Sequence, residues 1–371
     1  MGHATGVTIV AIDVGPAVGP VTGVGQFVVQ LIDALAVLPE PPRLRRYVLS
    51  FRAALPDGVR RLPYPAGLTL RAWGRTEHPR ARRPLGDADV VHGTNFVVPP
   101  SGLPSIVTIH DCSFVTRPDL VNATVRSFER VARRAIARGA WVHTPSAYVA
   151  AQVGALLGAE RVRVVPHGPP EHMVAPMDAA PLPGLDGRPY ILAIGTREPR
   201  KNLATLVDAF GLLHAEHPDL ALVLVGSDGP DRPNIDAALG RVPRTAAEQV
   251  LLTDWVPDQH RAAVLSRAAV LAYPSLDEGF GLPLLEAMQL GVPIVAADAG
   301  AIPEVAADAA LLVDPTDAAA LAKALVAAID DEAVRTRLLV AGRARLAAYS
   351  WPRSAAAFAA LYREVAMDGP A

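Results

Sequence analysis

The sequence contains one cysteine, two lysines and few aromatic residues, and it lacks long apolar runs. Cys112 has no second cysteine with which to form an intramolecular disulfide, which fits a reducing compartment. No apolar run reaches the roughly 18 residues that a membrane-spanning helix needs. Residues 1–10 also lack the basic start and long apolar core of a secretion signal. We therefore expect a soluble, cytoplasmic protein whose only route to a membrane is peripheral contact at the inner face.

The 371 residues are enough for two domains of ordinary size. Charge is unevenly distributed along them. The formal net charge is −2, but residues 1–170 hold 19 arginines against 11 acidic residues, and the rest of the chain has an acidic excess. Arginines recur between residues 43 and 83 and again along the predicted helix Val121–Arg138. These stripes are either solvated surfaces or surfaces attracted to phosphate or to anionic membrane lipid. A nucleic-acid partner is not expected.

Short apolar runs that suit buried strands alternate with helical segments through both halves of the chain. In the first half we expect strands at Val7–Ile12, Tyr47–Phe51, Leu68–Ala72, Asp89–Val91, Ser105–Ile109, Trp141–Thr144 and Val162–Pro166. In the second half we expect strands at Tyr190–Ile194, Leu220–Val225, Val250–Leu252, Ala269–Tyr273, Val292–Ala296 and Leu311–Asp314. The pattern predicts two doubly wound parallel-sheet domains, Rossmann-like in form, that face each other across a cleft. We place them at residues 1–170 and 190–351, with a proline-rich linker at 171–189.

The stretch from residue 268 to residue 298 carries the strongest chemical signal. A predicted strand leads into the loop Pro274–Gly281, and a helix then runs up to Gly291, a residue that suits a helix C-terminus. Glu278 lies near the end of the loop, and Glu286 follows eight residues later in the expected first turn of the helix. Between them stand residues whose amides would point outward at the helix N-terminus: Phe280, Gly281 and Leu282. Two carboxylates around such an anion cradle would hold a sugar by its hydroxyls and a diphosphate by its charge.

A second candidate site follows the predicted strand Tyr190–Ile194. The turn Gly195–Asn202 places basic side chains between the end of a strand and the start of a helix, a position well suited to a diphosphate. These basic residues are Arg197, Arg200 and Lys201. A solvated helix start is the alternative, but one of only two lysines in the chain stands here, which favours a binding role.

Two further candidate binding segments, both in the first half of the chain, follow expected strands. The glycine-rich loop Gly15–Gly25, which includes Gly23, fails the dinucleotide fingerprint because a valine stands where the third glycine belongs. We expect this loop to bring its backbone close to a phosphate. His110 and Asp111 follow a predicted strand, and ligands bind at the carboxyl ends of strands in doubly wound sheets. A histidine at a strand end is often structural, but this position favours a functional one.

Five sequence blocks belong together. The longest is S-x-D-E-G-F-G-L-P-x-x-E-A-M-x-x-G-x-P-I-V-A, which begins at Ser275. The others are T-G-V-G-Q-F from Thr22, T-I-H-D from Thr108, V-P-H-G from Val165 and G-T-R-E-P-R-K-N from Gly195. The set resembles the retaining glycosyltransferases of family four, which have the GT-B fold, and the resemblance spans most of the chain. The sequence departs from the family at His167, where an asparagine is usual, and at Thr196, where many relatives have an arginine.

The resemblance implies a site for a nucleotide-sugar donor, with Glu286 on the ribose hydroxyls. The transferred sugar would be held through its hydroxyls by Glu278, Phe280 and Gly281. The diphosphate would be held by Gly23, Gly25, Lys201, Gly281, Leu282 and either Arg197 or Arg200. The nucleoside would lie against Gly226, Trp255 and Val256. The catalytic centre would comprise His110, Asp111 and Glu278, with no metal, and a terminal helix at about residues 352–366 would pack back on the first domain.

The resemblance is greatest to bacterial mannosyltransferases that use GDP-mannose. It implies transfer of a hexose to a glycan or lipid-linked acceptor, in the synthesis of surface polysaccharide or glycolipid. No cofactor is expected, since the nucleotide-sugar is a substrate. A UDP-glucose-type donor, a related-fold epimerase or phosphorylase, and a non-catalytic sugar-nucleotide binding subunit remain alternatives. A pyridoxal-dependent phosphorylase would need a buried lysine, and only Lys201 and Lys323 are available.

Overall fold

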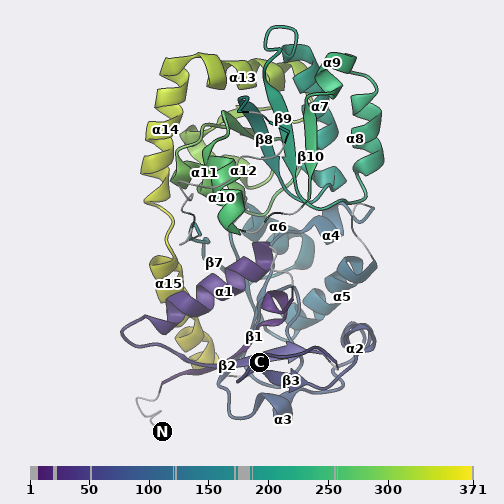
Figure 1. Cartoon of the computed structure of the whole chain (residues 1–371). Helices are drawn as coiled ribbons and strands as arrows, with labels where there is room; N and C mark the ends of the chain where they lie inside the picture. Colours follow the sequence, from purple (N-terminus) through teal and green to yellow (C-terminus); the bar gives the residue numbers. More distant parts are fainter. Residues whose placement is uncertain are drawn as a thin grey trace. The chain divides into compact units, whose positions relative to one another are not determined.

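The chain forms two compact units, each built on its own parallel β-sheet (Figure 1). One unit comprises Met1–Gly168 and Ser350–Ala371, and the other comprises Pro169–Tyr349. The computed structural model describes residues 7–19, 23–50, 52–119, 121, 123–170, 173, 184–185, 187–254, 256 and 258–369. Among these residues, no helix combines the length and the apolar character needed to cross a bilayer.

The first unit contains a seven-stranded sheet in the order β3-β2-β1-β4-β5-β6-β7, in which every pair is parallel. Its strands are β1 (Ile9–Asp13), β2 (Arg43–Leu49), β3 (Arg60–Leu62), β4 (Val90–Gly93), β5 (Ser105–Thr108), β6 (Trp141–Thr144) and β7 (Val162–Val164). The strand order reverses between β1 and β4, where Ile12 is aligned with His92. Ligands bind beside such switch points in doubly wound sheets, at the carboxyl ends of the strands.

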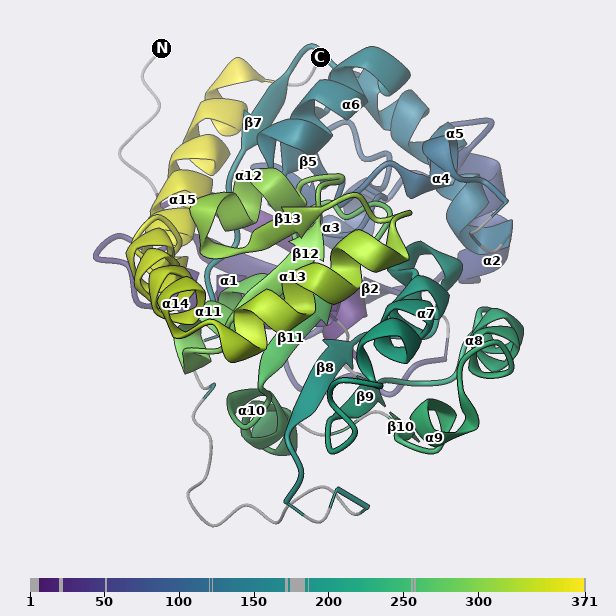
Figure 2. The same cartoon turned by 90° about the horizontal axis from the view of Figure 1, so that it is seen from above.

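Helices cover both faces of this sheet. They are α1 (Gly23–Ala36), α2 (Ala66–Trp73), α3 (Arg82–Leu85), α4 (Ser113–Thr116), α5 (Ala123–Ala137), α6 (Ala147–Leu157) and α15 (Trp351–Asp368), with a 3₁₀ turn at Gly15–Ala17. Alternate residues of β1 face opposite cores: Val10 and Ile12 pack with α1 and α15, and Ala11 packs on the other side. The terminal helix α15 lies beside α1 in both views (Figures 1 and 2).

The second unit contains a six-stranded sheet in the order β10-β9-β8-β11-β12-β13, again parallel throughout. Its strands are β8 (Tyr190–Ile194), β9 (Ala221–Val225), β10 (Val250–Thr253), β11 (Val270–Tyr273), β12 (Ile294–Ala297) and β13 (Leu311–Val313). The order reverses between β8 and β11. The loops that follow these two strands therefore form the expected ligand position of this unit.

Helices also flank the second sheet on both sides. They are α7 (Leu203–Leu213), α8 (Arg232–Leu239), α9 (Arg244–Ala247), α10 (Asp258–Ser266), α11 (Leu282–Leu290), α12 (Ile302–Ala306), α13 (Ala318–Asp330) and α14 (Glu332–Leu346), with 3₁₀ turns at Pro199–Lys201 and Ala307–Ala309. Helices α7 and α13 lie side by side (Figure 2) and share one core with alternate strand residues. Helices α10, α11 and α12 contribute to a second core on the opposite face.

The expected parallel-sheet architecture is confirmed, and one expected strand is wrong. Leu68–Ala72 lies within helix α2. Its apolar residues alternate, which suggested a strand, but the buried side chains are Thr69 and Trp73, four residues apart as on one face of a helix. Leu68 is exposed, so its apolar character misled the prediction. Strand β3 and helix α14 were not expected.

Candidate functional site

The switch point of the second sheet brings together two cations and the carboxylates that pair with them. The 3₁₀ turn after β8 carries Arg200 and Lys201, and the loop after β11 carries Glu278. Lys201 Nζ lies 2.5 Å from Glu278 Oε1, and Arg200 Nη1 lies 2.7 Å from Glu278 Oε2. Arg200 Nη1 also donates to the carbonyl of Asp277 at 2.9 Å. Residues that are 77 positions apart in the sequence therefore form one cluster.

The charges of this cluster determine the ionisation of Glu278. Burial alone would raise the pKa of its carboxyl group, but the charges and hydrogen bonds of Lys201 and Arg200 outweigh burial and lower the pKa to about 2. Glu278 is therefore a carboxylate at any physiological pH and can only accept hydrogen bonds. Arg200 Nη2 also lies 3.7 Å from Glu198 Oε2, so two cations and two carboxylates form a formally neutral cluster at this edge of the sheet.

A small recess lies between the ends of β8 and β11. Its lining includes Gly195, Lys201, Tyr273 and Ser275. Lys201 Nζ is 5.1 Å from the centre of the Tyr273 ring, which is a cation–π distance. A side chain at Gly195 would crowd Lys201, because a Cβ atom there would be 3.1 Å from Lys201 Cε. Because Gly195 has no side chain, Lys201 can lie across the C-terminal end of β8.

Helix α11 starts at the end of the loop that carries Glu278. Its N-cap, Gly281, has φ of 98°, a left-handed conformation that favours glycine. Leu282 begins the helix, Pro283 fits its first turn, and Gly291 ends it at φ of 67°. The expected helix and its end at Gly291 are confirmed. The side chain of Phe280 is buried, edge-on to Tyr349.

Glu286 lies in the second turn of α11, not in the first turn as expected, because the helix starts at Leu282. Its side chain is completely buried, and both carboxylate oxygens contact Arg261 Nη2 from α10. The sequence analysis did not identify Arg261. An arginine that directly precedes the apolar run Ala262–Leu265 was the available signal, since a buried cation requires a carboxylate partner.

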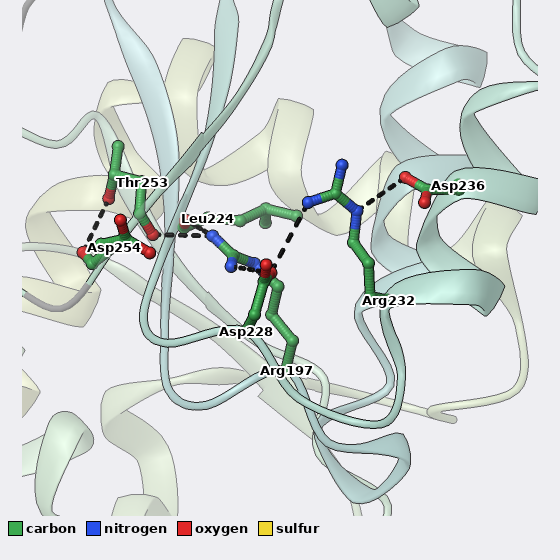
Figure 3. Close-up of polar contacts among 7 residues, drawn as sticks. All are labelled: Arg197, Leu224, Asp228, Arg232, Asp236, Thr253 and Asp254. Carbon is green, nitrogen blue, oxygen red and sulfur yellow. Dashed lines mark hydrogen bonds and ion pairs between the residues drawn. The ribbon is translucent and has the colours of Figure 1, made fainter.

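Arg197 and Arg200 leave the same turn but lie in different places. The Arg197 side chain is 3% exposed, and its Nη1 lies 2.5 Å from Asp228 Oδ1 (Figure 3). Its Nη2 donates to the carbonyl of Thr253 at 2.7 Å. The structure therefore brings Arg200 to Glu278 and holds Arg197 at the ends of β9 and β10.

The remaining residues expected at the nucleoside follow β9 and β10. Gly226 has φ of 149°, and a Cβ atom there would be 2.1 Å from the carbonyl oxygen of Gly195, so the loops after β8 and β9 touch through their backbones. Val256 is partly buried against the core that contains α10 and α11. Trp255 lies outside the described residues, as does most of the expected linker 171–189.

In the first unit, His110 follows the end of β5. Its Nε2 lies 2.9 Å from the carbonyl oxygen of Thr94, so this nitrogen carries the proton and Nδ1 carries the lone pair in the neutral ring. Burial lowers the pKa of His110, although the bond to Thr94 and the nearby charge of Asp111 oppose the shift. Asp111 itself accepts hydrogen bonds from the amide and hydroxyl of Ser113 at 2.9 and 2.6 Å. It thus stabilises the turn that starts α4.

The expected phosphate loop Gly15–Gly25 is wrong at its C-terminal end, because Gly23 and Gly25 form the first turn of α1. Glycine is a weak helix former, but the apolar face of α1 packs against α15, and tertiary packing outweighs local propensity. Thr22 lies outside the described residues. Phe27, the last residue of this block, packs against the ring of His110 at 5.3 Å between ring centres.

A buried chain of hydrogen bonds lies next to Phe27, and the sequence analysis assigned it no role. His143 Nε2 donates to the carbonyl of Val165 at 3.0 Å, which makes Nδ1 the acceptor for the Thr108 hydroxyl at 2.9 Å. Thr108 in turn accepts from His92 Nε2 at 2.8 Å, and His92 Nδ1 accepts from the Tyr362 hydroxyl at 2.8 Å. All four side chains are fully buried, and the bonds run in one direction. The chain joins β4, β5 and β6 to the terminal helix.

The described parts of both units contain no group of three or more histidine, cysteine, aspartate or glutamate side chains arranged to hold a metal ion. The expectation that no metal is needed stays a prediction.

Comparison with protein families gives two matches in tandem. Residues 21–170 match the family described as Glycosyltransferase Family 4, and residues 188–331 match the family described as Glycosyl transferases group 1. The O-antigen chain mannosyltransferase B of Escherichia coli is 29% identical over 359 residues, which cover 90% of this chain and 93% of that protein. The phosphatidyl-myo-inositol mannosyltransferase of Mycobacterium leprae is 28% identical over 362 residues, which cover 92% and 90% of the two chains.

Solved structures share the fold. The sucrose-phosphate synthase of Thermosynechococcus elongatus superposes with a TM-score of 0.75 at 22% identity, over 97% of this chain and all of that one. WaaG, a glycosyltransferase involved in lipopolysaccharide biosynthesis, gives a TM-score of 0.70 at 16% identity, over 95% and 99%. The two family matches together span most of the sequence. One falls in each of the two parallel-sheet units of the structure, apart from the first two residues after Gly168. The chain belongs to the family-4 glycosyltransferases and has the GT-B fold.

Proposed function

We propose that this glycosyltransferase transfers mannose from GDP-mannose, with retention of configuration, to a glycan or lipid-linked acceptor in surface polysaccharide or glycolipid synthesis. The observation that carries the proposal is the cluster of Glu278, Lys201 and Arg200 at the switch point of the second sheet. Its support from relatives is the similarity, over about nine-tenths of the chain, to two proteins named as mannosyltransferases. Their names mention an O-antigen chain and phosphatidyl-myo-inositol, which supports a glycan or lipid-linked acceptor.

In this proposal the donor diphosphate binds Arg200 and Lys201. The N-terminal end of α11, with the amides of Gly281 and Leu282, lies next along the chain from Glu278 and adds positive potential. As the bond to the sugar breaks, negative charge grows on the leaving diphosphate. Fixed cations and amides stabilise that charge without reorganising, which lowers the barrier. The two basic side chains would thus do the work that a metal ion does in other transferases.

Glu278 would position the transferred sugar. Its pKa of about 2 keeps it ionised, so it accepts hydrogen bonds from sugar hydroxyls, and holding the reactive carbon in place contributes to the rate. The same two cations make Glu278 a poor covalent nucleophile, since they stabilise its negative charge. This supports reaction on one face of the sugar, with the leaving phosphate taking the proton of the incoming hydroxyl. Phe280 and Gly281 would complete the contacts with the sugar.

The nucleoside would occupy the neighbouring side of the same unit. Glu286 would accept hydrogen bonds from the ribose hydroxyls, in exchange for part of its contact with Arg261. Gly226, Val256 and Trp255 would lie against the base.

The first unit would supply the acceptor side. His110, neutral because burial lowers its pKa, would accept a hydrogen bond from a sugar hydroxyl through Nδ1. Asp111 would hold the turn beside it, while Gly23 and Gly25 would let the N-terminus of α1 approach the phosphates without side chains in the way. The exposed arginines of α5 would contact anionic lipid near a lipid-linked acceptor: Arg126, Arg130 and Arg133.

The test is calorimetric titration with GDP, UDP, ADP and dTDP in the absence of added metal. We expect a clear preference for GDP and mannosyl transfer from GDP-mannose. Lys201→Ala should remove most of the binding, whereas Lys323→Ala, which changes the other lysine of the chain on the exposed side of α13, should leave it unchanged. Preference for another nucleotide would refute GDP-mannose as donor, and equal binding by the two lysine variants would refute the site.

A further inference from the structure

Arg197 lies at the ends of three strands of the second sheet, although its own turn also carries the proposed diphosphate residues. Its side chain is 3% exposed, and the guanidinium group reaches toward β9 and β10 (Figure 3). Nη1 forms an ion pair with Asp228, which follows β9. Nη2 donates to the carbonyl of Thr253, the last residue of β10. A guanidinium group placed among strand-end carbonyls satisfies acceptors that the sheet leaves open.

The carbonyl of Thr253 is held from two sides. It accepts from Arg197 Nη2 at 2.7 Å and from the amide of Gly226 at 3.2 Å. Thr253 is the residue at which the chain leaves the sheet toward Asp254 and Val256. The direction in which the chain continues into Asp254 is therefore set by Arg197 and Gly226 together.

The backbone of Arg197 is equally constrained. Its amide donates to the carbonyl of Ser227 at 3.1 Å, and its carbonyl accepts from the amide of Asp231 at 3.0 Å. A Cβ atom at Gly229 would be 2.4 Å from that carbonyl oxygen, so only a glycine permits this approach. The loops after β8 and β9 interlock around Arg197. The position of its side chain thus follows from the packing of several backbone segments.

Burial and ion pairing also separate Arg197 from the phosphate site. Its guanidinium is neutralised by Asp228, whose other basic neighbour, Arg232, is itself paired with Asp236 at 2.8 Å (Figure 3). The Arg200 side chain, by contrast, is 21% exposed and lies with Lys201 in the cluster around Glu278. A buried, neutralised guanidinium whose two terminal nitrogens already contact carboxylate and carbonyl oxygens offers little to an incoming diphosphate.

We propose that Arg197 is a positioning residue for the nucleobase end of the donor site: it holds the carbonyl of Thr253 and so fixes the end of β10 beside Gly226, where the base binds. This inference rests on the proposed function, in which the base of a nucleoside diphosphate lies against Gly226 and Val256. It assigns the two arginines of one turn to different parts of the donor. Arg200 acts on the diphosphate, and Arg197 acts through the backbone on the base.

The experiment compares binding of GDP and of inorganic pyrophosphate by calorimetry. Arg197→Gln should weaken GDP binding about tenfold or more, the usual effect of losing a hydrogen bond from a charged group, and should leave pyrophosphate binding unchanged. Arg200→Gln should weaken both ligands by the same factor. Arg232→Gln is the matched control, because it removes an arginine that contacts the same Asp228 but not Thr253, and both affinities should be unchanged.

Two results would overturn the assignment: equal loss of GDP and pyrophosphate binding in Arg197→Gln, or unchanged GDP binding in that variant. If Arg197→Gln does not fold, Arg197→Lys serves the same comparison, since it keeps a positive charge near Asp228 and loses the planar fork that reaches Thr253. A wild-type protein that binds no nucleoside diphosphate more tightly than pyrophosphate refutes the proposed function itself. If Arg197 has no positioning role, the wild-type protein still binds GDP more tightly than pyrophosphate, so the two refutations can be told apart.

Discussion

The buried histidines of the first unit should make its stability depend strongly on pH. Burial, followed by the charges of neighbouring histidines, lowers the pKa of His92 and of His167 well below the usual value of 6.5. Burial also lowers the pKa of His143 to about 3, against the opposing bond to the Val165 carbonyl. These rings stay neutral in the folded unit and take up protons on unfolding. The free energy of unfolding should therefore fall as the pH drops below about 6.5.

The contribution of His143 can be worked out from its two pKa values. Between pH 7.5 and pH 5.0 the ring is neutral in the folded unit, where its pKa is about 3, and becomes protonated in the unfolded chain, where it is 6.5. The difference lowers the free energy of unfolding by about 2 kcal/mol at pH 5.0. His92 and His167 act in the same direction.

Asp13 opposes this trend in the same unit. Burial raises the pKa of its carboxyl group from 3.8 to about 6, although the amide of Gly15 partly offsets the shift. At pH 5.0 the folded unit therefore holds a proton on Asp13 that the unfolded chain lacks, which raises the free energy of unfolding by about 1 kcal/mol. Because these effects partly cancel, the wild-type pH dependence alone does not isolate the histidine effect.

Urea unfolding of wild type and His143→Gln at both pH values isolates it. Three of the four tryptophans, Trp73, Trp141 and Trp351, belong to the first unit, so most of the change in tryptophan fluorescence reports its unfolding. The variant should be less stable at pH 7.5, and its loss of stability between the two pH values should be about 2 kcal/mol smaller than that of wild type. His260→Gln, which removes an exposed histidine of the second unit, should keep the wild-type pH dependence. Equal pH dependence in wild type and His143→Gln would refute a neutral, buried His143.

Three further substitutions test other parts of the structure. Gly93→Ala should lower the free energy of unfolding by about 3 kcal/mol or more in urea titrations, because the new Cβ would be 1.9 Å from the carbonyl oxygen of Val97. A variant as stable as wild type would show that the loop at Val97 has another conformation. Glu278→Gln should keep or increase GDP affinity in calorimetry, since the two cations lose their counter-charge, while sugar transfer falls about a hundredfold; loss of GDP binding would contradict the assigned role. Arg261→Ala should cost about 3–5 kcal/mol in chemical unfolding by leaving Glu286 buried without its partner, and Glu286→Gln in the same chain should restore part of this; no restoration would argue against the pairing.

Much of the second unit could be predicted from local sequence. The apolar run before Pro274 and the glycine at 291 mark a strand and a helix end, because burial and left-handed backbone conformation each favour particular residue types. The same stretch also allowed Glu278 to be placed in the loop and Glu286 in the helix that follows it. These features depend on residues that are close in sequence, so the sequence carries enough information to place them.

Side-chain partners over long separations could not be predicted in this way. The choice between Arg197 and Arg200 stayed open because both leave one short turn, and their directions depend on the loops after β9 and β11. The partner of Glu286 stands 25 residues earlier, on a different helix. Leu68–Ala72 was mistaken for a strand because the side that packs against the core is decided by neighbouring elements.

The sequence by itself determined the alternation of strands and helices, the family and the residue types available for a donor site, because periodicity, capping and motif spacing are local properties. Only the tertiary structure decided which cation lies beside Glu278, which helix covers Glu286, and how His92 and His143 come to share one hydrogen-bond chain. Parallel strands bring their carboxyl ends to one edge of a sheet, and residues many positions apart meet there. The charges that govern the pKa of Glu278 arise from that meeting and are absent from any local pattern.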